Sequence, residues 1–173
     1  MRALADAERI HRFSAALADA ARVDGRVYFT GGATAVLVGW RATTIDIDLK
    51  LEPEDDALLR SIPRLKDTLQ VNVELASPAD FIPVAAGWED RSPFIERIGR
   101  LSFHHFDLYA QALAKIERGH VQDLADVRAM LDRGLIEPAR ALGAFEAIEP
   151  YLYRYPAVDA ASFRRAVVEA FGA

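Results

Sequence analysis

VYFTGGATAVLVGWRATTIDIDLKL, residues 27–51, is the stretch that decides the fold. Residues 27–30 form a short β-prone run, two glycines follow at positions 31 and 32, and residues 33–40 have the character of a short buried helix. Residues 45–51 then alternate strictly between apolar and polar side chains, which is the pattern of a strand with one buried face. The stretch therefore predicts a strand, a glycine turn, a helix and a second strand in direct succession.

Helices and strands are also predicted on either side of this stretch. Residues 3–23 place apolar side chains at helical spacing between charges, which indicates an amphipathic helix. Residues 55–69 favour a helix that Pro63 interrupts, and residues 70–75 alternate as another strand. A Pro-containing loop is expected over residues 77–93.

The last part of the chain is predicted to be mainly helical. Residues 101–103 favour one further strand, and from Asp107 onward helical segments are separated near Gly119, residues 134–138 and residues 150–156. Because strands come early and helices late, the expected class is α+β (mixed α/β), with a small mixed β-sheet and a helical C-terminal half.

Composition limits the fold and the compartment. The 173 residues, 51% of them hydrophobic, suffice for one buried core. We therefore expect a single domain over residues 1–173, with a core at about 24–131 and a helical extension at about 132–173. The formal net charge of −5 argues against a surface that holds nucleic acid by bulk attraction. With no cysteine, no signal-peptide core and no long apolar run, a cytoplasmic protein without a membrane partner is expected.

Asp46 and Asp48 are the first candidate site residues. Two positions apart on a strand, they lie on the same face with Cα atoms roughly 6.5–7 Å apart. Carboxylate oxygens in this arrangement suit two divalent cations about 3.5–4 Å apart, so the expected cofactor is a pair of Mg²⁺ ions, with Mn²⁺ as a substitute. The alternative is a solvated strand face, although two acids, poor strand formers, in one strand need a reason.

Gly31 and Gly32 form the second candidate feature. Glycines between a strand and a helix let backbone N–H groups approach a phosphate, and the helix N-terminus adds the positive end of its dipole. The alternative interpretation of the pair is a tight turn.

Glu74 is the third candidate. Taken alone it is a surface glutamate. If its strand pairs beside the strand of Asp46 with the polar faces aligned, it completes a trio of carboxylates. Such a trio would repel strongly without a metal ion, so a cation is its natural partner.

Together these residues resemble a known family. Gly31-Gly32, a spacer of thirteen residues, Asp46-Ile47-Asp48 and a later Val73-Glu74-Leu75 are similar to the pattern of the polymerase-β-like nucleotidyltransferase superfamily. Within it the chain resembles the AbiEii-like toxins of abortive-infection and toxin–antitoxin systems, which carry a Lys and then Arg-Asp-x-x-Asp on downstream helices. Here Lys115-Ile116-Glu117-Arg118 precedes Gln122-Asp123-Leu124-Ala125-Asp126. The resemblance covers roughly residues 28–131.

The resemblance implies a role for each matching residue. It makes Asp46, Asp48 and Glu74 the metal ligands and catalytic carboxylates. It assigns nucleotide binding to Gly31, Gly32, Thr44, Lys115 and Asp123, with Asp126 in support.

The function that the resemblance implies is metal-dependent transfer of a nucleoside monophosphate from an NTP. The recipient would be RNA, with tRNA as the expected species, or a protein hydroxyl, and the chain would act as the toxin beside a cognate antitoxin. Two alternatives stay open. One is an adenylyltransferase antitoxin that modifies a partner toxin, and the other is a catalytically silent nucleotide-binding or interaction domain.

Several polar residues have a simpler interpretation as well. Lys115 lies on a helical stripe with Gln111 and Arg118, which either leans toward a triphosphate or forms an exposed basic edge. Asp123 falls in the first turn of the next helix, where an acid favours the helix dipole. His104 and His105 are adjacent on a strand and point to opposite faces, so we expect one buried and one surface histidine rather than a metal pair.

Arginines are expected to shape the groove that receives the acceptor. The candidates are Arg41, Arg91, Arg97 and Arg118.

Overall fold

The structure is a computed structural model that describes residues 2–172. Within that range the chain forms one five-stranded mixed sheet and seven α-helices, which confirms the predicted α+β class. The chain divides into two compact units, a sheet unit and a helical unit. The sheet unit runs to Ser77 and includes Ser92–His105, and the helical unit consists of Pro78–Arg91 and everything from Phe106 onward. This division does not coincide with the predicted limit of a C-terminal extension near residue 132, because two helices before that point belong to the helical unit.

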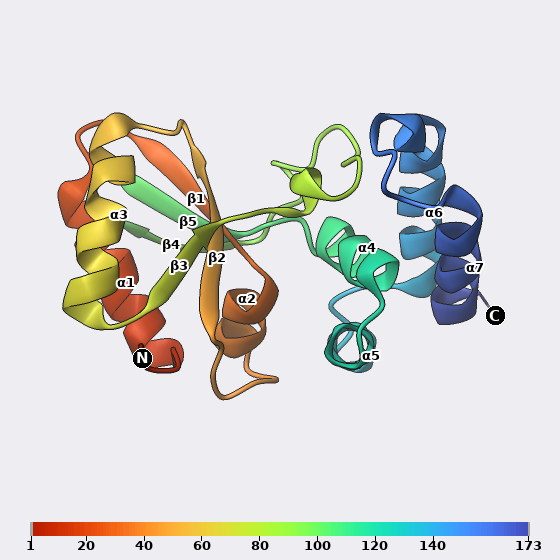
Figure 1. Cartoon of the computed structure of the whole chain (residues 1–173), viewed down its shortest axis with the longest axis horizontal. Helices are drawn as coiled ribbons and strands as arrows, with labels where there is room; N and C mark the ends of the chain where they lie inside the picture. The colour runs from red at the N-terminus through yellow and green to blue at the C-terminus, as the bar shows by residue number, and fades with distance from the viewer. Residues whose placement is uncertain (1, 173) are drawn as a thin grey trace. The chain divides into compact units, whose positions relative to one another are not determined.

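The sheet has the strand order β3-β2-β1-β5-β4 (Figure 1). Its strands are β1 (Gly25–Thr30), β2 (Asp46–Glu52), β3 (Asn72–Leu75), β4 (Phe94–Ile98) and β5 (Leu101–His105). β1 pairs antiparallel with β2 and parallel with β5, β2 pairs parallel with β3, and β4 pairs antiparallel with β5. β1 is therefore the central strand that joins the two halves of the sheet.

Helices α1 (Ala7–Ala20) and α3 (Asp56–Leu69) pack together against one face of the sheet (Figure 1). The core between them takes every second residue of the strands, as the alternation predicts. Its strand members include Val27, Phe29, Ile47, Leu49, Leu51, Val73, Leu101 and Phe103. The polar residues between them, among them Asp46, Asp48 and Glu74, are thereby placed on the opposite face.

Helix α2 (Gly31–Val38) follows β1 without a loop. Residues 32–36 of this helix are all buried, and Ala33 and Val36 join the core of the sheet unit. This confirms the short buried helix predicted after the glycine pair, with its start at Gly31 itself. The helix ends at Gly39, whose φ of 113° suits a residue without a side chain.

Two predicted details are wrong, and one strand was missed. Ile45 was expected on the buried face, but β2 begins at Asp46 and the Ile45 side chain is 66% exposed. Pro63 does not interrupt α3: its ring is on the exposed side of the helix, and the packing of the buried side outweighs one lost hydrogen bond. Strand β4 was not predicted at all, although a turn at Gly99, with φ 56°, joins it to β5 as a hairpin.

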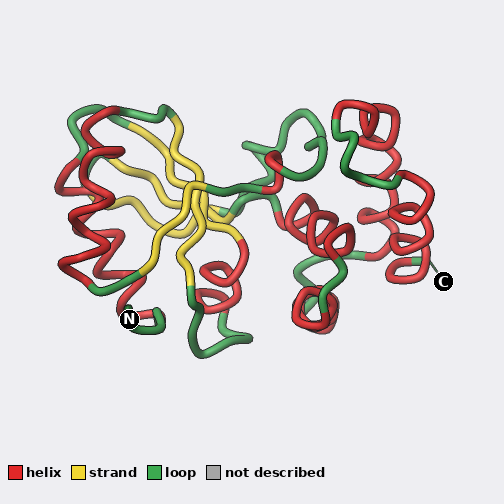
Figure 2. The backbone as a smooth tube through the Cα atoms, in the orientation of Figure 1, coloured by secondary structure: helices red, strands yellow, loops and turns green. Residues whose placement is uncertain are grey.

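The helical unit contains α4 (Leu108–Arg118), α5 (Val121–Asp132), α6 (Pro138–Ile148), the 3₁₀ helix η2 (Glu149–Arg154) and α7 (Ala160–Phe171) (Figure 2). The short 3₁₀ helix η1 (Pro78–Asp80) begins the loop that also belongs to this unit. The breaks fall near Gly119, Gly134 and Pro150, as the sequence predicts, and both glycines have a positive φ. Among residues 2–172, none of the helices has the length and apolar character needed to cross a membrane.

His104 and His105 point to opposite faces of β5, as predicted. His104 is buried beside Tyr28, with ring centroids 5.4 Å apart, and its Nε2 lies 2.9 Å from the Ser102 hydroxyl. His105 is half-buried rather than on the surface, and its Nδ1 lies 3.0 Å from the Thr34 hydroxyl of α2. Burial, together with the neighbouring His104, lowers the pKa of His105 to about 4. The neutral His105 therefore connects β5 to the helix that follows the glycine pair.

We expect His105 to make the fold sensitive to acid. Its pKa is near 6.5 in the unfolded chain and about 4 in the folded one, so between these values only the unfolded chain takes up the proton. The contribution is complete above pH 6.5 and falls as the pH drops, by about 2 kcal/mol at pH 5. Urea unfolding of wild type and His105→Asn at pH 7.5 and pH 5 measures it. The variant keeps a polar atom near Thr34 and should lose less stability on acidification; equal losses in both proteins would contradict the assignment.

Candidate functional site

The three predicted carboxylates lie on one face of neighbouring strands. In the parallel pair β2–β3, Asp48 stands opposite Glu74 and Asp46 stands opposite Asn72. Paired strands lie about 4.8 Å apart, so Asp48 and Glu74 are next to each other, with Asp46 one step along the same face of β2. The alignment on which the predicted trio depends is therefore present.

Thr30 extends this arrangement on the other side of β2. It is the last residue of β1 and stands opposite Asp48 in the antiparallel pair β1–β2. Thr30 is buried, Asp46 and Asp48 are half-buried, and Glu74 is exposed. The row Thr30–Asp48–Glu74 thus runs across three strands from a buried hydroxyl to an accessible carboxylate. Thr30 was not among the predicted site residues, although alternation along β1 places it on the polar face.

Gly31 brings the start of α2 against this row. Its φ is +60°, a conformation that side-chain-bearing residues rarely adopt. A Cβ on Gly31 would lie 3.0 Å from Oδ2 of Asp48, so the space beside the carboxylate is also reserved for a glycine. The positive end of the α2 dipole is therefore next to a carboxylate.

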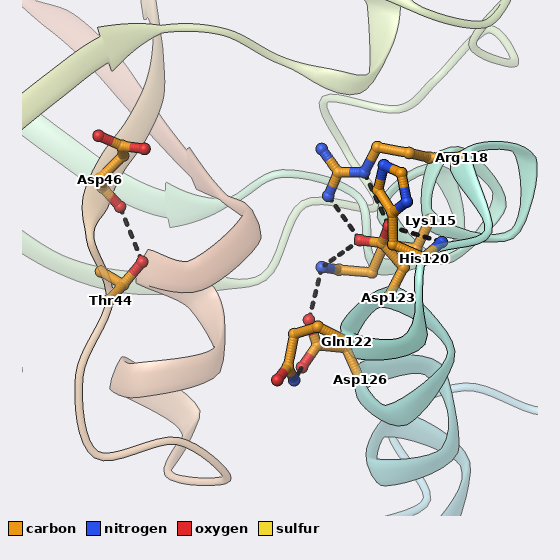
Figure 3. Close-up of polar contacts among 8 residues, drawn as sticks. All are labelled: Thr44, Asp46, Lys115, Arg118, His120, Gln122, Asp123 and Asp126. Atoms are coloured by element: carbon orange, nitrogen blue, oxygen red, sulfur yellow. Dashed lines mark hydrogen bonds and ion pairs between the residues drawn. The ribbon is translucent and has the colours of Figure 1, made fainter.

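Gly32 is selected by crowding and not by its backbone angle. A Cβ on Gly32 would lie 2.0 Å from Oγ1 of Thr44 and 3.5 Å from Nη1 of Arg41. The Thr44 hydroxyl donates to the Asp46 carbonyl at 3.0 Å (Figure 3), and its backbone exchanges hydrogen bonds with Ala5. The buried Thr44 thus packs between the start of α2 and the start of β2. Arg41, one of the four predicted arginines, therefore lies beside Gly32.

The donor atoms of this face fit a divalent cation of the Mg²⁺ type. Asp46, Asp48 and Glu74 offer only carboxylate oxygens, the ligands that Mg²⁺ prefers. The absence of a side chain at Gly31 leaves room beside Oδ2 of Asp48. Among residues 2–172, however, no three acidic or imidazole side chains are gathered closely enough to form a ligand cluster. The register of the strands places the carboxylates side by side without gathering three of them at one point.

Lys115 is in the helical unit and is buried in an ion pair. Its Nζ lies 2.8 Å from Oδ2 of Asp126 and 3.9 Å from Oδ1 of Asp123 (Figure 3). Lys115 is 5% exposed and Asp126 is fully buried, so the interpretation as an exposed basic edge is wrong. Gln122 also donates a hydrogen bond to Oδ1 of Asp126, at 3.0 Å.

Asp123 links the same cluster to Arg118 and to the start of α5. The Arg118 guanidinium donates to both carboxylate oxygens, and the backbone N–H of His120 donates to Oδ2 at 3.2 Å. Burial acts to raise the pKa of Asp123, but the hydrogen bonds and charge of Arg118, with the charge of Lys115 and the His120 N–H, together hold that pKa below its usual range. Asp123 is therefore a buried, charged carboxylate that accepts a hydrogen bond at the start of α5.

The other predicted arginines also have intramolecular partners. Arg91 donates to the carboxylate of Asp107 at 2.9 Å, and Arg97 lies 3.8 Å from Asp24. Both arginines are thus engaged in contacts within the protein, and the arginine-lined groove stays a prediction.

Comparison with family models, curated proteins and solved structures gave no match to this chain. Membership of the nucleotidyltransferase superfamily thus stays a prediction that depends on the residues described above.

Gly32→Ala is expected to destabilise the sheet unit by about 1–3 kcal/mol, because the new methyl group overlaps Thr44. Gly143→Ala in α6 is the matched control: nothing lies within 4 Å of its Cβ position, and alanine favours a helix by about 0.5–1 kcal/mol. Urea unfolding measures both. A Gly32→Ala protein as stable as Gly143→Ala would show that Thr44 yields easily and that crowding does not select this glycine.

Lys115→Met should cost about 3–5 kcal/mol of stability, because it leaves the Asp126 carboxylate buried without its cation. The double variant Lys115→Met/Asp126→Leu removes both charges and should recover most of that loss. Thermal unfolding of the two variants decides the matter. If the double variant is the less stable protein, the ion pair is not the interaction that Lys115 provides.

Proposed function

We propose that this protein is a metal-dependent nucleotidyltransferase that moves a nucleoside monophosphate from an NTP to a hydroxyl group. The observation that carries the proposal is the register of β2 and β3, which places Asp48 beside Glu74 and on the same face as Asp46. The second support is the glycine at the start of α2, which lies against the Asp48 carboxylate. A phosphate-binding helix start and a set of carboxylates on one face are the two parts that phosphoryl transfer requires.

Each residue of this face has a distinct role in the proposal. Asp46 and Asp48 would hold the divalent cations, and Glu74 would be the third ligand. When bound, Mg²⁺ supplies the positive charge that offsets the oxygens of the triphosphate. The backbone at the start of α2 would orient the phosphates, and Arg41 beside Gly32 adds a cation of the protein's own.

The proposed reaction is a substitution at the α-phosphorus of the NTP. The oxygen of the acceptor hydroxyl forms a bond to the α-phosphorus, and the bond from that phosphorus to the bridging oxygen breaks. Pyrophosphate leaves with the electron pair of the broken bond. Glu74, the exposed member of the trio, takes up the proton of the acceptor hydroxyl.

RNA, with tRNA as the first candidate, or a protein hydroxyl is the proposed acceptor, and growth control by a toxin–antitoxin pair is the proposed setting. Both come from the resemblance in sequence. Incubating the protein with Mg²⁺, one α-labelled NTP at a time and total RNA or lysate separates the acceptors, because labelled RNA and labelled protein resolve on a gel.

Asp46→Asn, Asp48→Asn and Glu74→Gln should each reduce label transfer by about 100-fold or more, because each removes a charge that acts on the reacting phosphates. Glu52→Gln is the matched control. It lies on the same strand and face, roughly 13 Å beyond Asp48, and should keep wild-type activity. Circular dichroism checks that every variant is folded.

Expression in a bacterium separates the proposed roles. A toxin arrests growth as wild type but not as Asp48→Asn, and a cognate partner relieves the arrest. An antitoxin is harmless alone and protects against its partner. Harmless expression in every combination, together with no label on any acceptor, would overturn the proposal and leave a silent domain.

A further inference from the structure

The helical unit carries a pocket of its own. The loop that follows η1 forms one wall, and the end of α6 with η2 forms the other, around a volume of about 830 Å³. Every residue of its lining belongs to this one unit. The volume falls within the range of small-molecule sites, roughly 300–1,000 Å³. None of the residues so far assigned a role takes part in it.

Hydrogen bonds hold the loop wall of this pocket in place. The hydroxyl of Tyr155 donates to the Ala79 carbonyl at 2.7 Å. The guanidinium of Arg91 donates to the carbonyls of Ala85 and Ala86, at 3.0 and 2.9 Å, and is itself anchored on Asp107. The loop wall is therefore held by contacts of the chain itself, at one end with Tyr155 and at the other with Asp107.

Aromatic rings line a large part of the pocket. Trp88 stacks on Phe106, with ring centroids 4.4 Å apart and planes 8° from parallel, so its indole is fixed in orientation. Tyr151 and Tyr155 line the opposite wall, and Tyr151 is 46% exposed. Pro83 and Ile148 add apolar side chains to the lining. Such a lining favours a flat, apolar group.

Among the described residues that line the pocket, Arg154 is the one with a charge. Its guanidinium carbon lies 5.0 Å from the centroid of the Tyr151 ring and 5.6 Å from that of Tyr153, and its Nε donates to the Tyr153 hydroxyl. Within residues 2–172, no carboxylate lies within 4.0 Å of this guanidinium. The Arg154 guanidinium is thus oriented by the rings of Tyr151 and Tyr153, and no carboxylate in that range offsets its charge.

We propose that this pocket binds a nucleotide, with the base among the aromatic rings and the phosphate on Arg154. Base stacking on aromatic side chains and phosphate recognition by a planar guanidinium are the contacts that proteins use for unstacked nucleotides. The site needs no divalent cation and does not depend on Asp46, Asp48 or Glu74. The ligand is either a free nucleotide or one nucleotide of a single-stranded RNA.

A peptide with an aromatic and an acidic residue is the competing ligand, and the structure favours it less. Peptides that dock in grooves commonly use backbone hydrogen bonds. In this wall the carbonyls of Ala79, Ala85 and Ala86 already accept hydrogen bonds from Tyr155 and Arg91. The three rings and the single cation match one base and one phosphate more closely.

Fluorescence of Trp88 tests the proposal directly. The chain has two tryptophans, so a Trp40→Phe background leaves Trp88 as the only reporter. AMP is titrated in EDTA, followed by adenosine and a 5′-phosphorylated single-stranded hexaribonucleotide. We expect saturable quenching by AMP, binding of adenosine at least about tenfold weaker, and a similar loss for AMP in Arg154→Gln. If the hexanucleotide binds more tightly than AMP, the site is assigned to RNA. If AMP binds more tightly, the site is assigned to a free nucleotide. Either result supports nucleotide binding in this pocket.

Arg165→Gln is the matched control, because it removes an arginine of the same unit that does not line the pocket. It should bind AMP as the background protein does, and Asp48→Asn should do so too, which keeps this test separate from that of the transferase. Absence of quenching at millimolar AMP, equal losses in Arg154→Gln and Arg165→Gln, or equal binding of AMP and adenosine would overturn the proposal. So would tighter binding of an acetylated Tyr-Asp dipeptide than of either nucleotide. Thermal unfolding checks that Arg154→Gln is folded.

Discussion

The antiparallel pairing of β1 with β2 is the constraint on which the rest of the sheet unit depends. Its register sets Thr30 opposite Asp48, so the chain that leaves β1 turns directly beside a carboxylate. Only a glycine satisfies that turn, because Gly31 combines a positive φ with a side-chain position 3.0 Å from Asp48. The same pairing fixes which face of β2 is buried, and β3 then follows β2 in register. A slip of one residue would move the acids of β2 into the core and the apolar residues out, so burial of Ile47, Leu49 and Leu51 enforces the arrangement of the polar face.

The helical unit is organised around a different kind of interaction. Lys115, Asp126 and Asp123 are buried and form a network with the more exposed Arg118, in which two cations meet two carboxylates. Charges are costly to bury, and a network of this kind is stable only when each member keeps its partners. Lys115 and Asp123 therefore have a structural reason to be where they are, whatever ligand approaches them. A role in nucleotide binding would have to be added to that structural role, and the stability of each variant has to be measured beside its activity.

Much of the fold was predictable because the sheet is built on strict alternation. The alternation of residues 45–51 and 70–75 predicted two strands and the polar face of each. Glycine and proline indicated the breaks between the C-terminal helices. Alternation alone could not predict the pairing of Asp48 with Glu74, since the pattern within one strand contains no information about its neighbour, and only the family resemblance indicated it. Strand β4 was missed because its half-buried residues do not alternate regularly between apolar and polar. The helix-breaking effect of Pro63 was overestimated because tertiary packing outweighs local helix propensity. The burial of Lys115 was missed for a similar reason: its partner Asp126 lies on another helix, and a helical stripe shows only the residues on its own helix.

The connectivity of the sheet has a consequence for how the protein is made. The chain passes from the sheet unit to the helical unit after Ser77, returns after Arg91 and leaves again after His105. The strands β1, β2 and β3 are therefore synthesised well before β5, which lies on the other side of β1. Until residues 101–105 leave the ribosome, β1 presents an unpaired edge of apolar residues such as Val27 and Phe29. An unpaired strand edge of this kind can form hydrogen bonds with strands of other molecules. The nascent chain therefore passes through a stage that is prone to aggregation. This stage ends when the β4–β5 hairpin pairs with β1.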